Sequence, residues 1–373
     1  MTDPTHLQWM LRCLELAQRA RGYTSPNPMV GCVIVKDGEV LGEGWHPAAG
    51  QPHAEVFALR AVQANYPDNP DLTKGATLYV NLEPCNHHGR TPPCTEAIIQ
   101  AGIGEVFVGM VDPDPRVSGG GCDRLRAEGI KVTVGIAEAE CQALNEAFYH
   151  RVLHQVPFGI LKYAMTLDGK IATTSGHSYW ITGESARREV HRLRADCDAV
   201  ITGGNTVRLD NPHLTTHGLS DRAPLRVVMT RSLDLPNVAN LWQVDAMHQT
   251  LVVTLPNQNP ELQTSLRDRG VEVLEIPELS VPWVMTELAQ RGCNSVVWEC
   301  GGVLAAQAIA AGAVQKVYAF IAPKLIGGKD APSPVADLGY EQMTQARSLS
   351  RTNFKQIGDD WLITGYLDSS QLA

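Results

Sequence analysis

One histidine and two cysteines constrain this chain more than any other feature. The stretch His53-Ala54-Glu55 is followed by Pro84-Cys85 and then by Pro93-Cys94. One imidazole and two thiolates form a ligand set that Zn²⁺ prefers, and three protein ligands leave the fourth tetrahedral position open to water. Since an open position is typical of a catalytic metal, the pattern predicts a catalytic zinc held by His53, Cys85 and Cys94.

Glu55 has the residue type and the place to move protons. It lies two residues from His53, is not needed as a ligand, and can exchange protons with a water on the metal. The combination is the H-x-E plus P-C pattern of zinc-dependent amino-hydrolases that act on nucleobases. Two other interpretations stay open. Each residue alone would be an ordinary packed side chain, and His87 or His88 would complete a closed, structural zinc site.

The length and composition indicate a globular protein of two domains. At 373 residues the chain exceeds one typical core. It has no apolar run of about 18 residues and no basic-then-apolar leader, so we expect a cytoplasmic protein that does not enter a membrane. Nine scattered cysteines predict reduced thiols rather than a disulfide framework.

The net charge of -9 argues against a nucleic-acid partner, so we expect a small substrate.

Residues 1–154 predict a first domain of alternating strands and helices, an α/β unit of two or three layers. Asp37-Gly38 is a turn dipeptide that favours a two-residue hairpin loop. A helix that begins at His53 would point the positive end of its dipole at the metal water. The apolar periodicity predicts helices at 5–21, 53–65, 122–128 and 138–154, another opened by Cys94, and strands at 31–36, 39–45, 77–82, 105–111 and 131–134.

Residues 155–373 predict a second α/β domain that begins after Gln155-Val156-Pro157. A mainly parallel sheet with crossover helices is expected, closed by an antiparallel pair at 354–357 and 361–367. Gly203-Gly204 and Gly301-Gly302 each read as a tight turn after a strand, and together they indicate one ligand across the sheet edge. The other expected strands are 158–165, 199–202, 225–229, 250–255, 271–275, 295–299 and 315–321, and the expected helices are 184–195, 282–291 and 304–311.

The spacing of the two cysteines makes a resemblance specific. Cytidine-type and tRNA-type deaminases separate them by two residues, whereas eight residues separate them here, Cys85-Asn-His-His-Gly-Arg-Thr-Pro-Pro-Cys94. With residues 26–35 and Asp112-Pro113-Asp114-Pro115, the chain resembles the bifunctional riboflavin-biosynthesis deaminase/reductases over nearly its whole length. The resemblance implies an N-terminal cytidine-deaminase-like α/β/α domain, a C-terminal dihydrofolate-reductase-like α/β domain, Zn²⁺ and NADPH as cofactors, and a homodimer.

The resemblance also implies the first reaction, hydrolytic deamination of 2,5-diamino-6-ribosylamino-4-pyrimidinone 5'-phosphate. It assigns zinc to His53, Cys85 and Cys94 and proton transfer to Glu55. The positions that would contact this phosphorylated pyrimidine are Asn27, His46, Arg90, Asp112 and Asp114. The family often has Asn where Asp114 stands. The plain alternatives are that Asn27 and Asp112 only shape turns beside proline and that Arg90 is a solvated surface cation.

For the second domain the resemblance implies NADPH-dependent reduction of the ribose of the deaminated product to a ribityl chain. The matching motifs are residues 166–170, 178–182 and 299–302. The implied NADPH contacts are Ala164, Trp180, Thr206, Asp210 and the segment 301–307, with Gly301, Gly302, Val303 and Leu304. The implied substrate contacts are Lys162, Ser178, Arg194, Leu214, His217 and Glu299. Lys162 and Asp210 are the candidates to help the ring-opened imine form.

Several reductase residues have plain alternatives. Trp180 would otherwise be a core residue, Lys162 a cation at a strand edge and Asp210 a turn residue before Asn-Pro. His217 departs from the family, which commonly has Arg there, and imidazole is shorter and only partly charged near neutrality.

Two other classes of function remain open on the sequence. One is an RNA-editing deaminase whose second half positions the nucleic acid, although the acidic charge and the long cysteine spacing argue against it. The other is a binding protein with a structural zinc and no turnover.

Overall fold

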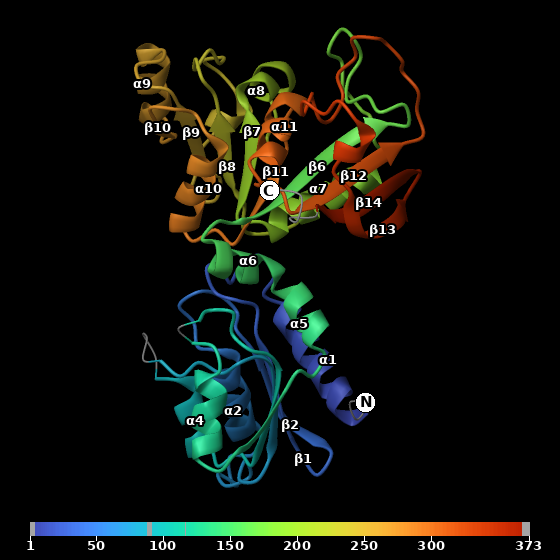
Figure 1. Cartoon of the computed structure of the whole chain (residues 1–373). Coiled ribbons are helices and arrows are strands. Elements are labelled where there is room, and N and C mark those ends of the chain that lie inside the picture. The colour runs from blue at the N-terminus through green and yellow to red at the C-terminus, as the bar shows by residue number, and fades with distance from the viewer. Residues whose placement is uncertain (1–3, 88–91, 116, 368–373) are drawn as a thin grey trace. The chain divides into compact units, whose positions relative to one another are not determined.

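Contacts within the chain divide it into two units, Met1–Gln155 and Val156–Ala373 (Figure 1). The computed structural model describes residues 4–87, 92–115 and 117–367. Over these residues, no helix is both long and apolar enough to cross a bilayer. Each unit has its own sheet and its own hydrophobic core, so each positions its own set of polar side chains.

The first unit is a five-stranded sheet between two layers of helices, with strand order β2-β1-β3-β4-β5. Its strands are β1 (Gly31–Lys36), β2 (Glu39–Trp45), β3 (Thr77–Leu82), β4 (Glu105–Met110) and β5 (Lys131–Val134). Its helices are α1 (Pro4–Gln18), α2 (Ala54–Asn65), α3 (Cys94–Gln100), α4 (Gly120–Ala127), α5 (Glu138–Leu144) and α6 (Glu146–His154). β1 pairs antiparallel with β2 and β3, while β3, β4 and β5 run parallel. Helices α1 and α5 cover one face and α2 and α4 the other, which confirms the α/β/α expectation (Figure 1).

Glycines in β2 bring α2 close to the sheet. A Cβ placed on Gly44 would lie 2.4 Å from the Ala58 nitrogen and 2.5 Å from the Ala54 oxygen, so only glycine fits there. The hairpin before it turns at Asp37 and Gly38, with φ values of 52° and 82°, as a two-residue loop requires. This close packing fixes the N-terminus of α2, where His53 and Glu55 lie.

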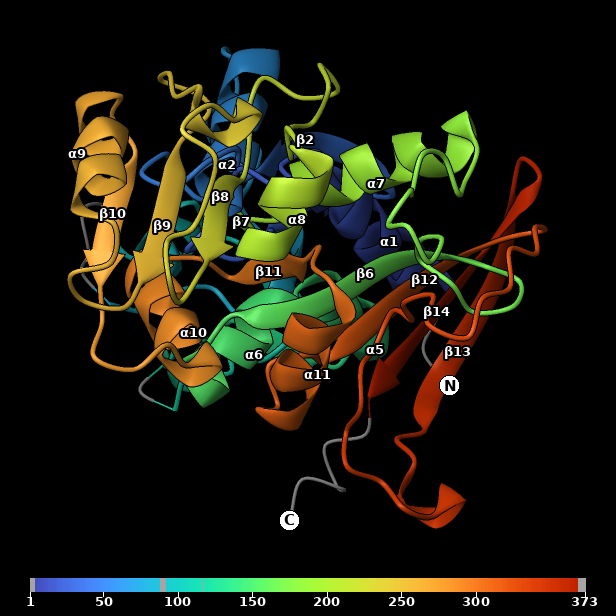
Figure 2. The same ribbon diagram turned by 90° about the horizontal axis from the view of Figure 1, so that it is seen from above.

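The second unit is a nine-stranded sheet with strand order β10-β9-β8-β7-β11-β6-β12-β14-β13. Neighbours from β10 to β12 are parallel and β14 and β13 are antiparallel, as the sequence predicted. Helices α10 and α11 lie on one face and α7 and α8 on the other (Figure 2). The strands are β6 (Phe158–Thr166), β7 (Ala199–Gly203), β8 (Leu225–Met229), β9 (Thr250–Thr254), β10 (Glu272–Glu275), β11 (Ser295–Trp298), β12 (Lys316–Ala322), β13 (Leu349–Ile357) and β14 (Asp360–Leu367). The helices are α7 (Glu184–Asp196), α8 (Gly204–Asp210), α9 (Pro260–Asp268), α10 (Val281–Gln290) and α11 (Gly302–Ala310), with short 3-10 turns η1 (Asn240–Trp242) and η2 (Met343–Gln345).

The structure corrects the sequence prediction in three places. The single helix expected at 138–154 is broken at Asn145, because the Asn145 side chain accepts a 2.8 Å hydrogen bond from the Met29 nitrogen and donates a 2.9 Å bond to its oxygen. Gly203 and Gly204 are not a simple turn but lead into α8, and Gly301 and Gly302 likewise lead into α11. Helix α9, which begins after the N-cap Asn259, was not predicted.

Candidate zinc centre and reductase site

The three expected zinc ligands come from three different elements of the first unit. His53 is the N-cap of α2, Cys85 follows β3, and Cys94 is the first residue of α3. Their ligand atoms all lie within 4.8 Å of one another, and His53 Nδ1 is 3.5 Å from Cys85 Sγ and 3.3 Å from Cys94 Sγ. A tetrahedral zinc with bonds of about 2.0–2.3 Å separates its ligand atoms by about 3.5 Å. The donor set therefore fits zinc in both chemistry and spacing.

The protonation of Cys85 also suits a metal. Hydrogen bonding from Cys94 and from His53 holds the pKa of Cys85 well below its usual range, against the opposing effect of burial. The Cys85 thiol is therefore poised as the thiolate that zinc binds. Within the described parts of the chain the group has three members, and His87 is not one of them. His88 lies outside the described residues.

Glu55 lies in the first turn of α2 with its carboxyl group buried. The side chain is 3% exposed, and its Oε2 has no hydrogen-bond partner among the described residues. Burial, together with the charge on Cys85, raises the pKa of Glu55 to about 7. A carboxyl group with that pKa takes up and releases a proton readily near neutral pH, as a general acid and base must.

A cavity of about 680 Å³ opens beside this cluster within the first unit. Both His53 and Glu55 line it, together with four of the residues expected to contact the substrate. These four are Asn27, His46, Asp112 and Asp114. The fifth, Arg90, lies outside the described residues.

Hydrogen bonds fix the polar wall of the cavity. His46 Nδ1 lies 3.0 Å from the Pro52 oxygen, so this ring nitrogen donates and Nε2 accepts from Asn27 Nδ2 at 3.0 Å. The His46 ring meets the His53 ring edge-on, with 5.4 Å between centroids. Asp112 Oδ1 accepts a 2.9 Å bond from the Asp114 nitrogen, and burial raises the pKa of Asp112. Asn27 and Asp112 both line the cavity.

Glu83 was missed by the sequence reasoning. Its carboxylate is 4% exposed and accepts four backbone hydrogen bonds, from Asp112 (3.2 Å), Gly119 (2.9 Å), Gly121 (2.9 Å) and Cys122 (3.0 Å). It therefore ties the loop that carries Asp112 to the end of β3. The available signal was an acid directly before Pro84-Cys85, at the end of a buried strand.

One face of α6 was also missed. Phe148, Arg151, Val152 and Gln155 line the cavity and recur at helical spacing. The sequence analysis treated 138–154 as one helix. Because the break at Asn145 gives α6 a direction of its own, the residues of α6 that line the cavity could not be identified from that prediction.

In the second unit, Lys162, Arg194 and Glu299 form one ion-pair network. Glu299 is 8% exposed, and its carboxylate lies 2.5 Å from Arg194 Nε, 3.0 Å from Arg194 Nη2 and 3.3 Å from Lys162 Nζ. Burial alone would raise the pKa of Glu299, but Arg194 and Lys162 lower it to about 2. Lys162 therefore lies within the sheet and is not a solvated edge cation.

A second polar group surrounds Asp210, at the end of α8. Ser178 Oγ donates to Asp210 Oδ1 at 3.1 Å, the Tyr179 hydroxyl donates to the Asp210 oxygen at 2.6 Å, and burial raises the pKa of Asp210. Trp180 is 61% exposed, with the Arg187 guanidinium 4.5 Å from its ring centroid. Trp180 is therefore a surface ring stacked on a cation and not a core residue.

The remaining expected reductase residues lie on β6, α8, α11 and the loop after α8. Ala164 is in β6, Thr206 in α8, and Gly301 is the N-cap of α11, which continues with Gly302, Val303 and Leu304. A Cβ on Gly302 would lie 2.7 Å from the Ser333 oxygen, whereas one on Gly301 would meet nothing within 4 Å. Leu214 is buried.

His217 stacks on His191 of α7, with 4.1 Å between ring centroids. Burial lowers the pKa of both rings, that of His191 to about 4.

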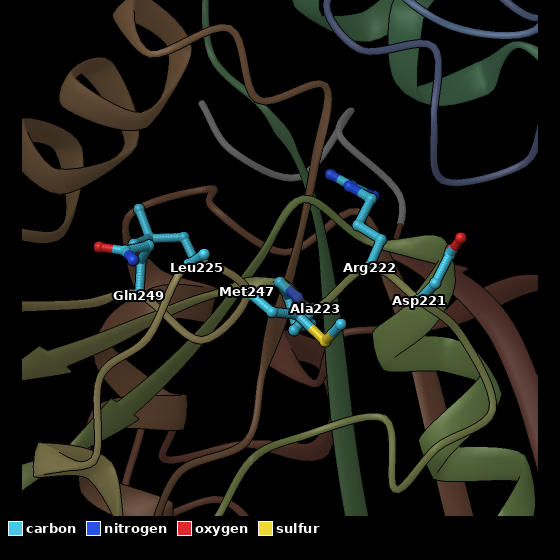
Figure 3. A pocket seen from close by; sticks show the side chains of 8 residues that line it. Asp221, Arg222, Ala223, Leu225, Met247 and Gln249 are labelled. Atoms are coloured by element: carbon cyan, nitrogen blue, oxygen red, sulfur yellow. The ribbon is translucent and has the colours of Figure 1, made fainter.

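A separate cavity of about 590 Å³ lies at the amino ends of β8 and β9 (Figure 3). It is lined by Asp221, Arg222, Ala223, Pro224, Leu225, Ala246, Met247 and Gln249, none of which the sequence indicated. The expected reductase site lies at the carboxyl ends of the strands, where Glu299 and α11 follow β11 and where α8 follows β7. The cavity at the amino ends of β8 and β9 is therefore distinct from that site.

The chain is similar to known proteins over both units. Residues 3–110 match the family model described as cytidine and deoxycytidylate deaminase zinc-binding region, and residues 157–363 match the one described as RibD C-terminal domain. The riboflavin biosynthesis protein RibD of Synechocystis is 58% identical over 98% of this chain and 97% of its own length.

Two solved structures also match nearly the whole chain. RibD of Acinetobacter baumannii has a TM-score of 0.87 and 37% identity, covering 98% of this chain and 99% of that one. A diaminohydroxyphosphoribosylaminopyrimidine deaminase/5-amino-6-(5-phosphoribosylamino)uracil reductase from Thermotoga maritima has a TM-score of 0.85 and 34% identity, with the same coverage.

Proposed function

Since this chain belongs to the RibD family of bifunctional deaminase/reductases of riboflavin biosynthesis, we propose that residues 1–154 carry the deamination and residues 155–373 the reduction. The proposed first substrate is 2,5-diamino-6-(5-phosphoribosylamino)pyrimidin-4(3H)-one, and the second is the uracil that it yields. The observation that carries the first assignment is the three-ligand cluster beside a buried Glu55 oxygen that has no hydrogen-bond partner in the described part of the chain. The similarity to the Thermotoga maritima enzyme supports the substrates.

His53, Cys85 and Cys94 would hold the zinc, which would act as a Lewis acid and make water a better nucleophile. Water adds to the ring carbon that carries the amino group, and ammonia leaves. Glu55 Oε2 takes a proton from the water and delivers it to the departing nitrogen, a role that its raised pKa supports. Asn27, His46, Asp112 and Asp114 bind and orient the pyrimidine, and Arg90 is proposed as a contact for its phosphate.

In the second unit NADPH supplies a hydride to the sugar carbon. We assign NADPH contacts to Ala164, Trp180, Thr206, Asp210 and the segment 301–304, and substrate contacts to Ser178, Arg194, Leu214, His217 and Glu299. Lys162 and Asp210 are the proposed proton carriers for the ring-opened imine. The hydrogen bond that the Ser178 hydroxyl donates to the Asp210 carboxyl group, and the Lys162 contact with Glu299, support these roles.

His217 is the proposed substrate contact at which the family commonly has Arg. Its lowered pKa leaves it neutral at pH 7, so it acts there as a hydrogen-bond partner rather than as a fixed cation.

Two further proposals concern the assembly and the compartment. None of the nine cysteines, all of which lie in the described residues, forms a disulfide, which supports a reducing, cytoplasmic compartment. A homodimer is proposed from the resemblance to the family, and β13 is an edge strand of the nine-stranded sheet. No nucleic-acid or membrane partner is proposed.

The deciding experiment mixes the pyrimidine substrate with NADPH and follows ammonia and NADPH absorbance in one reaction. We expect ammonia first and NADPH consumption after it. Zinc-free protein should release no ammonia but still consume NADPH with the uracil substrate. Ammonia release by zinc-free protein would contradict the first assignment, and no NADPH consumption with the uracil would contradict the second.

A further inference from the structure

The charge balance of the deaminase cavity is unusual for a site that takes a phosphorylated substrate. Four acidic residues line it: Glu55, Glu83, Asp112 and Asp114. Among the described lining residues Arg151 is the only Arg or Lys. A phosphate dianion in such a cavity needs a cation, because the chain as a whole carries a net charge of -9.

Arg151 is held in place by a hydrogen bond to another residue that lines the cavity. Its Nη2 donates to the Pro26 oxygen at 3.0 Å. The next residue, Asn27, bonds to His46, and the His46 ring lies against His53. The guanidinium is thus connected to the metal ligand through successive wall residues.

The helix that carries Arg151 is itself anchored to this wall. Asn145 directly precedes α6 and binds both backbone atoms of Met29, so the break between α5 and α6 sets the direction of the new helix. Phe148 and Val152 of the same helix also line the cavity and so add apolar groups to the wall that carries Arg151. An Arg flanked by apolar groups is less hydrated and holds an oxyanion more tightly than a fully solvated one.

We infer that Arg151 supplies a second cation for the 5'-phosphate of the pyrimidine substrate, besides the contact proposed above, and so contributes to the selectivity of the deaminase for phosphorylated pyrimidines. The inference rests on the proposed function and adds a residue to it. A guanidinium carries five N–H donors in a fork that matches phosphate oxygens, so the bond to Pro26 and a phosphate contact are compatible. The reacting ring lies at His53 and Glu55 while its phosphate lies against α6.

The test compares Arg151→Gln with wild type on two substrates, the phosphorylated pyrimidine and the same compound without its phosphate. For the phosphorylated substrate KM should rise about 10- to 100-fold, the loss expected for a charged hydrogen bond. The kcat should change little, because the phosphate is remote from the reacting carbon. For the substrate without phosphate KM should be the same in both proteins. If Arg151→Gln still prefers the phosphorylated substrate as strongly as wild type does, the inference is wrong.

Two variants control for structural damage. Arg126→Gln removes an exposed cation of α4 in the same unit, where it pairs with Asp123, and should leave both KM values unchanged. Arg151→Lys keeps the charge but not the fork and should recover part of the lost selectivity. If Arg151→Lys, Arg151→Gln and wild type had equal KM values for the phosphorylated pyrimidine, the inference would be contradicted.

A binding measurement separates failure of the inference from failure of the proposed function. If wild type deaminates neither compound, the proposed function fails. Hydrogen exchange of residues 146–155 then still tests Arg151, with inorganic phosphate as the probe. Phosphate should slow exchange there in wild type and Arg126→Gln but not in Arg151→Gln. Equal slowing in all three would overturn the phosphate contact.

Discussion

Arg194 donates two hydrogen bonds to the carboxylate of Glu299, from Nε to Oε1 at 2.5 Å and from Nη2 to Oε2 at 3.0 Å. Lys162 adds a third contact to the same buried carboxylate. Because the pKa of Glu299 falls from 4.5 to about 2 on folding, the network stabilises the folded chain above about pH 4.5 and this stabilisation is lost as the pH falls through 2.

The first prediction is that Glu299→Gln lowers the free energy of unfolding by about 3 kcal/mol at pH 7, since it leaves two cations without their partner. Urea unfolding followed between pH 7 and pH 3 measures it, and the gap between wild type and variant should shrink as the pH falls. Glu272→Gln breaks an exposed pair with Arg291 and should cost less than about 1 kcal/mol. A pH-independent gap would show that the ion pair is not its cause.

The second prediction concerns Glu55→Gln. The amide cannot carry a proton between water and the leaving nitrogen, so ammonia release should fall about 10²- to 10⁴-fold. Zinc content by elemental analysis and NADPH consumption with the uracil substrate should match wild type. A variant that keeps full deamination would exclude Glu55 as the proton carrier.

The third prediction concerns the metal. Purified protein should contain about one zinc per chain, and Cys94→Ser should lose most of it, because the oxygen of serine is a poor substitute for thiolate. Cys293→Ser changes a buried thiol outside the cluster and should keep its zinc. Equal zinc contents in the two variants would contradict the ligand assignment.

The fourth prediction concerns Glu83→Gln. Its new NH₂ group would face backbone N–H donors that now bond to a carboxylate oxygen, so the loop from Asp112 to Cys122 should loosen. Hydrogen exchange at Gly119 and Gly121 should become faster by about tenfold or more. Glu43→Gln, which breaks the pair with Arg12 in the same unit, is the matched control and should leave exchange at those two amides unchanged. Unaltered protection in Glu83→Gln would show that the carboxylate does not hold the loop.

Local sequence signals were enough for most elements and for the metal cluster. The Asp37-Gly38 turn, the apolar run of β3 and the alternating strands of the second unit depend on near neighbours in the chain, so their bounds were close to those found. The zinc ligands could also be predicted from the sequence, because packing alone rarely explains one His and two Cys in such a pattern.

The sequence by itself determined which elements form and which donor atoms could hold a metal, since both depend on residue type and short-range spacing. Only the tertiary structure decided the break at Asn145, the four amides on Glu83 and the position of Arg151 in the cavity. Each of these depends on groups that are distant in the chain, and a side chain can satisfy a distant backbone group only after the sheet and helices have brought the two together.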